Sequence, residues 1–163
     1  MADNSIWSPW RSGFILKERE KGCVFCRLAK EKKASSKNLI LLQTDLCFIV
    51  MNKFPYNAGH LLVVPRRHVG TMERLTDPEA LELMRLTRRA VKAMKVAIKP
   101  NALNLGINLG RPAGAGIPGH LHMHVVPRWT GDSNFMPVIG GTRVHSIPMN
   151  HLHKILFAEL QKV

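Results

Sequence analysis

The sequence predicts a single α+β domain built around an antiparallel β-sheet. Short apolar stretches with strand character lie on both sides of one long amphipathic helix, and short turns join them. The length of 163 residues fits one domain and suffices to bury a core without disulfide bonds. We expect the domain to cover residues 1–163, with an N-terminal arm over 1–22 that packs on the body and a C-terminal extension over 130–163.

Three strands are predicted in the N-terminal half. Residues 39–42 and 46–51 are apolar runs of strand length, and Gln43-Thr44-Asp45 between them has the composition of a turn. Residues 54–59 contain Pro, Asn and Gly and are expected to form a loop. A third strand follows over 60–64, and Pro65 closes it.

One long helix follows these strands. Thr76 is a suitable N-cap, Pro78 stands early in the helix, and Glu79 occupies the capping-box position. Apolar residues then recur at helical spacing until Pro100 ends the pattern. Two more strands are predicted over 103–109 and 120–126, with a loop rich in Gly, Pro and Ala between them. A C-terminal helix is predicted over about 149–160.

The composition is strongly basic. There are 24 Lys and Arg against 11 Asp and Glu, which gives a net charge of +13 and a pI near 10.3. Such a charge attracts polyanions and speeds their encounter with the protein. Nucleic acid and nucleotides with phosphate chains both fit this charge, and charge alone does not separate them.

Nothing in the sequence predicts a membrane or secreted location. No apolar run approaches the ~20 residues of a membrane span. The start, Met1-Ala2-Asp3-Asn4-Ser5, lacks the basic and apolar regions of a signal peptide. Three cysteines are an odd number and fit a disulfide framework poorly. We therefore expect a cytoplasmic protein with reduced thiols.

The strongest functional signal is the run His120-Leu121-His122-Met123-His124-Val125-Val126. In a strand, residues two apart share a face, so three imidazoles line one side and the apolar residues face the other. Clustered imidazoles can bind a metal ion, or they can act on a phosphate as nucleophile and donors. A basic cluster favours the second chemistry, because the attacked group is an anion.

This triad and its context resemble the histidine-triad (HIT) family, whose signature alternates His with apolar residues in the same way. The run Asn57-Ala58-Gly59-His60 and its continuation to His68 are similar to the family's upstream block, which supplies an additional active-site histidine. Asn108-Leu109-Gly110 and residues 113–116 resemble its approach to phosphate, and Pro127-Arg128 also matches. The arm over 7–11 and the segment 129–135 look like the branch of diadenosine tetraphosphate phosphorylases and hydrolases.

The resemblance implies a five-stranded antiparallel sheet per subunit and a homodimer. It implies that His122 attacks the α-phosphorus of a nucleotide, while a backbone carbonyl holds its other ring nitrogen. Water or inorganic phosphate then discharges the nucleotidyl-histidine. His124 would donate to the phosphate or the leaving oxygen, His60 would donate to a non-bridging oxygen, and Asn52 would grip the ribose hydroxyls.

The loop before the triad departs from the family pattern. Many members carry Gln and then Ser or Thr where this chain has Gly116 and Ile117. Backbone N–H groups of Gly114 to Gly116, or the side chain of Asn108, could serve instead, since glycine lets the backbone approach a phosphate closely. Trp129 is interpreted either as a packing residue at the rim or as a residue that stacks on a base.

A second signal, Cys23-x-x-Cys26, is weak by itself, because no second cysteine pair follows. In zinc-containing relatives of the family, two such cysteines join a histidine of the upstream block and the first triad histidine. The resemblance therefore implies a structural, four-coordinate zinc held by Cys23, Cys26, His68 and His120. The alternative is a pair of free buried thiols.

The leading hypothesis is an enzyme that cleaves or transfers a nucleoside monophosphate unit. Diadenosine tetraphosphate is the favoured substrate, and hydrolysis, phosphorolysis and phosphoramidate cleavage stay open. The alternative is a zinc-stabilised basic nucleic-acid-binding module without catalysis, which would need cations grouped on one face with stacking aromatics. The cations look scattered along the sequence, and aromatics make up only 6%. The other predictions place Cys47 in a buried strand and three histidines on the surface: His145, His151 and His153.

Overall fold

The computed structural model of the chain describes residues 22–132, 139, 145 and 147–162. The expected N-terminal arm, apart from Gly22, and most of the segment 133–146 lie outside these residues. The described elements, in chain order, are α2 (Val24–Ala29), β1 (Ile40–Gln43), β2 (Cys47–Met51), β3 (Leu61–Pro65), the short 3-10 helix η2 (Met72–Arg74), α3 (Asp77–Ala97), β4 (Ala102–Ile107), β5 (Met123–Arg128) and α5 (Met149–Leu160).

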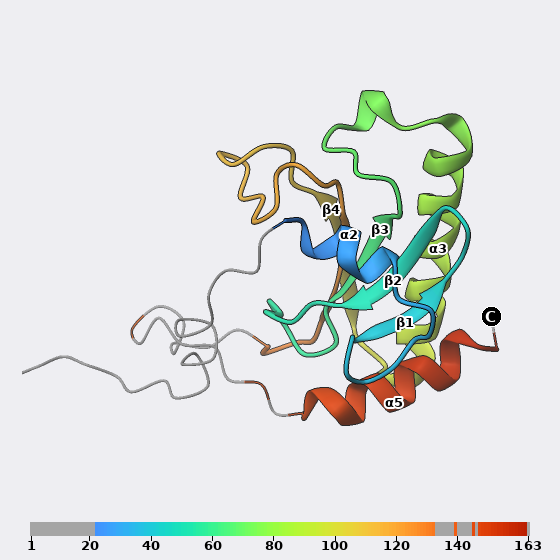
Figure 1. The fold of residues 1–163 in the computed structure, drawn as a ribbon. Helices are drawn as coiled ribbons and strands as arrows, with labels where there is room; N and C mark the ends of the chain where they lie inside the picture. The colour runs from blue at the N-terminus through green and yellow to red at the C-terminus, as the bar shows by residue number, and fades with distance from the viewer. Residues whose placement is uncertain (1–21, 133–138, 140–144, 146, 163) are drawn as a thin grey trace, which may run out of the picture.

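The five strands form one sheet in the order β1-β2-β3-β5-β4 (Figure 1). Each neighbouring pair is antiparallel, which confirms the predicted α+β class. The first three strands follow one another as a meander, because short connections join antiparallel neighbours. Strand β5 then inserts between β3 and β4, so β4 lies at one edge of the sheet and β1 at the other.

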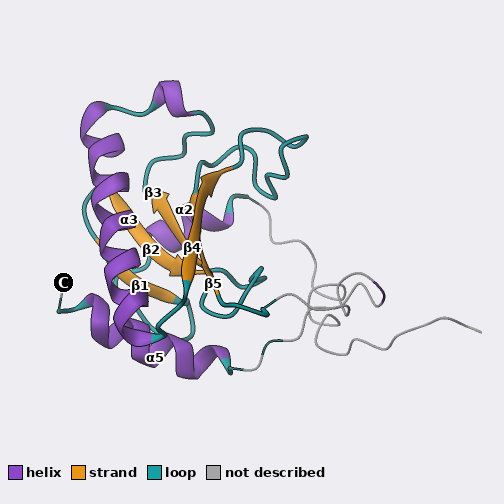
Figure 2. Cartoon of the chain, turned by 180° about the vertical axis from the view of Figure 1, so that it is seen from behind, coloured by secondary structure: helices purple, strands orange, loops and turns teal. Residues whose placement is uncertain are grey.

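Helices cover the two faces of the sheet differently. Helices α3 and α5 pack on one face, and α2 lies on the other, as the front and back views show (Figures 1 and 2). Every residue of β2 and β3 is buried, because apolar clusters fill the space on both sides of these central strands. Both faces being covered, these strands are continuously apolar rather than alternating.

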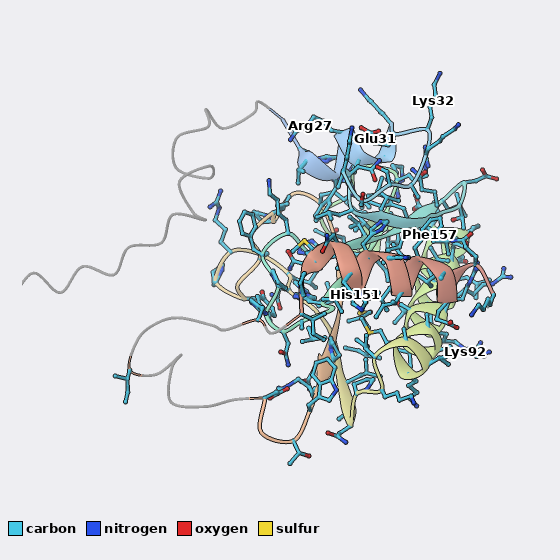
Figure 3. The ribbon with its side chains drawn as sticks, turned by 90° about the horizontal axis from the view of Figure 1, so that it is seen from below. Arg27, Glu31, Lys32, Lys92, His151 and Phe157 are labelled. Atoms are coloured by element: carbon cyan, nitrogen blue, oxygen red, sulfur yellow. The ribbon has the colours of Figure 1, made fainter. Side chains whose placement is uncertain are left out.

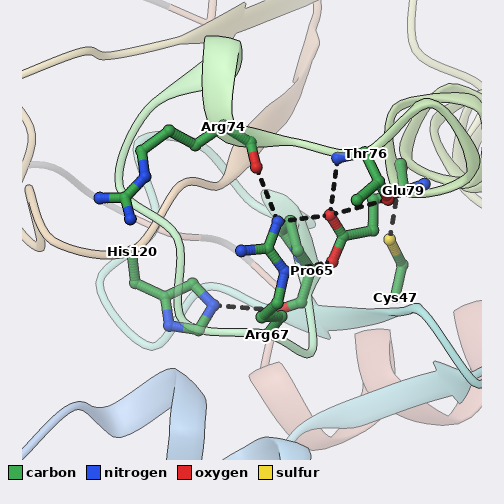
Figure 4. A network of polar contacts seen from close by, with 7 residues as sticks. All are labelled: Cys47, Pro65, Arg67, Arg74, Thr76, Glu79 and His120. Atoms are coloured by element: carbon green, nitrogen blue, oxygen red, sulfur yellow. Dashed lines mark hydrogen bonds and ion pairs between the residues drawn. The ribbon is translucent and has the colours of Figure 1, made fainter.

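The predicted start of the long helix is confirmed. The Thr76 hydroxyl accepts a hydrogen bond from the Glu79 backbone N–H, and the Glu79 carboxylate accepts one from the Thr76 backbone N–H, a complete capping box. The same carboxylate, 5% exposed, receives two hydrogen bonds from the Arg67 guanidinium at 2.8 and 2.7 Å (Figure 4). This pair ties the end of β3 to the start of α3.

One helix was not predicted, and two expectations are wrong in detail. The sequence did not predict α2, which begins directly after Cys23 and is anchored by its buried Phe25. The last strand begins at Met123 rather than His120, because the Leu121 N–H donates to the Val69 carbonyl at 2.7 Å, outside the sheet ladder. His153 is buried rather than exposed and lies 3.0 Å from the Ile40 carbonyl.

Candidate active site and metal site

The triad lies on the side of the sheet that faces α2. Leu121 and Val125 point into the apolar cluster under α3 and α5, so the histidines between them face the opposite way, as the alternation predicts. The ring of Phe25 covers them, with centroids 5.0 Å from His122 and 5.4 Å from His120.

His122 is held as a neutral imidazole with one free nitrogen. Its Nδ1 lies 2.8 Å from the His120 carbonyl oxygen, and a carbonyl can only accept, so Nδ1 carries the proton. The lone pair is therefore on Nε2. Burial lowers the pKa of His122, and the backbone bond opposes this shift in part. A neutral, oriented imidazole with an unprotonated Nε2 is what nucleophilic attack on phosphorus requires.

His60 and His124 form a second pair with a defined tautomer. The backbone N–H of Tyr56 donates to Nδ1 of His60 at 3.0 Å, and the Asn52 Nδ2 lies 3.2 Å from the same atom. Nδ1 of His60 is thus an acceptor, and its proton is on Nε2, which lies 2.9 Å from Nδ1 of His124. Nδ1 of His124 accepts the hydrogen bond from the Nε2–H of His60, so His124 carries its own proton on Nε2.

The Nε2 atom of His124 is left as a donor for something outside the protein. It is buried and has no hydrogen-bond partner among the described residues, although buried polar groups are normally paired. Burial first, and the neighbouring His122 second, lower the pKa of His124 to about 4. Burial likewise lowers the pKa of His60 to about 3. Both rings are therefore neutral near neutral pH.

Tyr56 closes over this pair. Its ring stacks on His124, with centroids 5.5 Å apart and planes 13° apart, and lies 4.7 Å from His60. The loop that carries Tyr56 turns at Gly59, which has φ +82°, and a Cβ there would lie 2.9 Å from the Ile98 side chain. Glycine is therefore required directly before His60.

Asp132 anchors the same loop. Its carboxylate accepts from the Asn57 side chain at 2.7 Å, from the Trp129 backbone N–H at 2.9 Å, and from two nitrogens of Arg128. Asn57 also donates to the Pro127 carbonyl. These hydrogen bonds hold the pKa of Asp132 well below its ordinary value, the Arg128 contribution being largest. The loop beside His60 is thus fixed to the end of β5.

The four residues expected to hold a metal do come together. One ligand atom from each of Cys23, Cys26, His68 and His120 lies within 4.8 Å of the others, a group that could hold a metal ion. The sulfur-to-nitrogen separations are 3.2 to 3.6 Å, and the two Nδ1 atoms are 3.3 Å apart. Zinc bond lengths in a tetrahedron give edges of about 3.5 and about 3.3 Å.

The tautomer of His120 supports this fit. Its Nε2 lies 2.8 Å from the Pro65 carbonyl (Figure 4), so its proton is there and Nδ1 presents a lone pair to the cluster. Two thiols and two imidazoles in this arrangement suit a closed zinc site with no open position. The metal cluster and the nucleophile candidate therefore lie in one short segment directly before β5, with His120 two residues before His122.

The remaining predicted site residues lie at different places. Asn52 is beside His60, as stated above. The side-chain nitrogen of Asn108 would lie 3.6 Å from a Cβ at Gly114, so the asparagine and the glycine loop are neighbours. The amides of Gly114 and Ala115 donate to carbonyls within that loop, whereas the space at Gly116 is open. Trp129 follows β5 and is separated from His124 by about 16 Å of extended chain.

Comparisons with known proteins agree with this geometry. The HIT domain family matches residues 33–131. A Mycobacterium tuberculosis protein named AP-4-A phosphorylase is 42% identical over 161 residues, 94% of this chain and 83% of that protein. Adenosine 5'-monophosphoramidase hnt1 of Schizosaccharomyces pombe is 30% identical over 106 residues, 65% of this chain and 74% of that protein. A zinc-bound histidine triad family protein from Mycobacterium smegmatis has the same fold, with a TM-score of 0.69 and 21% identity over 86% of this chain and 94% of that one.

An antiparallel sheet that presents ordered, neutral histidines, in a chain whose relatives are nucleotide-processing enzymes, defines a nucleotide hydrolase or nucleotidyltransferase. The chain belongs to the histidine-triad (HIT) family.

Some residues around the site had no signal in the sequence. Phe25 contacts His120 and His122 from a helix of only six residues, which has no capping side chain to reveal it. Tyr56 acts through its backbone N–H, a group that every residue except proline has. Asp132 contacts Asn57 across 75 residues of sequence, and only the Arg128 spacing of four residues could have indicated an ion pair.

Proposed function

We propose that the chain cleaves diadenosine tetraphosphate by attack of His122 on an α-phosphorus, and that inorganic phosphate discharges the intermediate. The free Nε2 lone pair of His122 supports the first step. The similarity to the M. tuberculosis protein named AP-4-A phosphorylase supports the choice of substrate and acceptor. The buried, unpaired donor on His124 is the single observation that best fits a phosphate ester in the site.

The Nε2 atom of His122 forms a bond to the α-phosphorus, and the bond to the bridging oxygen breaks, so adenosine triphosphate leaves. His124 donates a hydrogen bond from its Nε2–H to the leaving oxygen or to the phosphate and keeps its proton, and ATP leaves as an anion. An oxygen of inorganic phosphate then attacks the adenylyl-histidine, which releases ADP and restores His122.

The neighbouring residues take supporting roles in this proposal. Nε2 of His60 points at His124, so we assign His60 to orient His124 rather than to contact a phosphate oxygen itself. Asn52 binds the ribose hydroxyls. Asn108 and the Gly116 amide contact phosphate in place of the missing side-chain donor, because the Gly114 and Ala115 amides already donate within the loop. Trp129 stacks on a nucleotide base that lies away from His124.

In this proposal a structural zinc ion is held by Cys23, Cys26, His68 and His120. It fixes the start of α2 to the segment before β5, which carries His122. We also propose a homodimer. Strand β4 is an unpaired edge among the described strands, and its Leu105 is 51% exposed. Such an edge favours pairing with a second chain.

No described helix is long and apolar enough to cross a membrane. The cytoplasmic location stays a proposal.

Product analysis tests the reaction. Diadenosine tetraphosphate with isotopically labelled inorganic phosphate should give ATP and labelled ADP, whereas hydrolysis would give ATP and AMP with no label incorporated. His122→Ala should keep the fold and lose several orders of magnitude in turnover. Near wild-type turnover in that variant, or a nucleotidyl adduct mapped to another residue, would reject the mechanism. Light scattering should give twice the 18.3 kDa chain mass.

A further inference from the structure

Helix α3 carries a row of basic side chains on its outer face. Its members follow one another at steps of three or four residues, are all exposed, and form what we call the α3 basic face: Arg85, Arg88, Lys92 and Lys95. Residues at this spacing lie on one side of a helix, and Lys92 extends outward from α3 in Figure 3. No acidic residue interrupts the row. The structure thus groups cations that look scattered in the sequence.

This row is unfavourable for the isolated helix. Like charges three or four residues apart repel each other, and the helix dipole favours cations only in the last turn, where Lys95 lies. The acidic residues of α3 all precede Leu83, and the nearest, Glu82, approaches Arg85 at 3.9 Å. A polyanion bound along the face would balance this charge.

The proposed active site does not account for the α3 basic face. The buried side of α3 packs into the apolar cluster on one face of the sheet, whereas His122 lies on the other face, against Phe25 of α2. The sheet therefore separates the row from the histidines. Phosphates of a nucleotide bound at His122 cannot reach it.

We propose that the α3 basic face binds the phosphate backbone of double-stranded DNA without sequence preference. The row is about 15 Å long at about 1.5 Å of rise per residue, long enough to contact several phosphates of a duplex, whose charges follow one another every ~1.7 Å along the helix axis. An exposed helix fits the wide major groove of B-form DNA, whereas the major groove of A-form RNA is too narrow. Helix α3 has no aromatic residue, so it lacks the stacking platform that single strands require.

Two triple variants test the proposal by fluorescence anisotropy with a labelled DNA duplex of about 20 base pairs, roughly two helical turns. Arg88→Gln, Lys92→Gln and Lys95→Gln together should weaken binding by at least about tenfold and reduce the salt slope by about 3. The matched control removes the same charge on the exposed segment after α2, by Lys32→Gln, Lys33→Gln and Lys37→Gln, and should keep most of the affinity. Both proteins should keep wild-type thermal midpoints, and the α3 variant should keep wild-type turnover of diadenosine tetraphosphate.

Several outcomes would overturn the DNA site. These are no binding by the wild-type protein at low salt, equal losses in the two triple variants, displacement of the duplex by saturating AMP, and tighter binding to an RNA duplex or to phosphatidylserine vesicles than to DNA. Turnover is measured separately, so failure of this proposal is distinct from failure of the proposed reaction.

Discussion

The Nε2 atom of His60 lies 2.9 Å from Nδ1 of His124, and this contact decides which nitrogen of His124 carries a proton toward the site. The order of donation runs from the Tyr56 N–H to His60 and from His60 to His124, which leaves the Nε2 of His124 as the donor that we propose for the substrate. A neutral imidazole has one proton for two nitrogens. Loss of the first ring would let His124 adopt the other tautomer, with an acceptor facing the leaving oxygen.

We therefore expect His60→Ala to slow turnover of diadenosine tetraphosphate by about 10²-fold, the lower range for loss of one hydrogen-bond donor to the developing charge. An adenosine 5'-phosphoramidate substrate should lose more, because its amine leaves only with a proton, whereas ATP leaves as a stable anion. Exposed His151 provides the control, and His151→Ala should behave as wild type. Equal losses with both substrates would argue that His60 serves only the fold.

Asp132 should affect the hydrogen-bond chain from Tyr56 to His124 indirectly, through the loop that carries Tyr56. Asp132→Asn keeps the size of the side chain but removes the charge that binds Arg128 and one acceptor for Asn57. The loop that carries the Tyr56 N–H is then held less firmly, and we expect about a tenfold loss of turnover, again larger for the phosphoramidate substrate. Exposed Asp45 gives the matched control, Asp45→Asn. Unchanged kinetics in Asp132→Asn would show that Asp132 does not contribute to turnover.

The sequence predicted those features of the structure that depend on residues close together in the chain. Thr76 and Glu79 mark the start of α3 because a capping box is complete within four residues. The side of the triad followed from strand alternation. By contrast, the neighbouring positions of β3 and β5, which bring His60 to His124, depend on contacts 64 residues apart in sequence. The ligand set of the metal site and the role of His122 came from family resemblance, since spacing alone left metal binding and phosphate chemistry open.

Removal of one proposed metal ligand should lower the thermal stability of the protein much more than its turnover. Cys23→Ser replaces a side chain whose sulfur lies 3.3 Å from Nδ1 of His120. Elemental analysis should find about one zinc per chain in the wild type and far less in this variant, and the thermal midpoint should fall by more than about 5 °C. Turnover per folded molecule should fall much less. Cys47→Ala, at a buried cysteine outside the cluster, should keep its zinc. Wild-type protein purified without chelator and free of zinc would contradict the site.

The Arg67 and Glu79 pair should make the stability of the protein depend on acid pH. The hydrogen bond from Arg67 is the main cause that lowers the pKa of Glu79 to about 2, from an ordinary value of 4.5. A depressed carboxyl pKa adds stability above the ordinary value, and this contribution is lost as pH falls from 4.5 toward 2. At neutral pH, Glu79→Gln should lower the free energy of unfolding by about 1 to 2 kcal/mol, less than for a fully buried pair because Arg67 stays half exposed. Urea unfolding across this pH range should show the wild-type and variant curves converging in acid. Glu82→Gln removes a carboxylate that lies 3.9 Å from exposed Arg85, and its curve should run parallel to the wild type. Convergence of that curve as well would show that the acid dependence does not arise at Glu79.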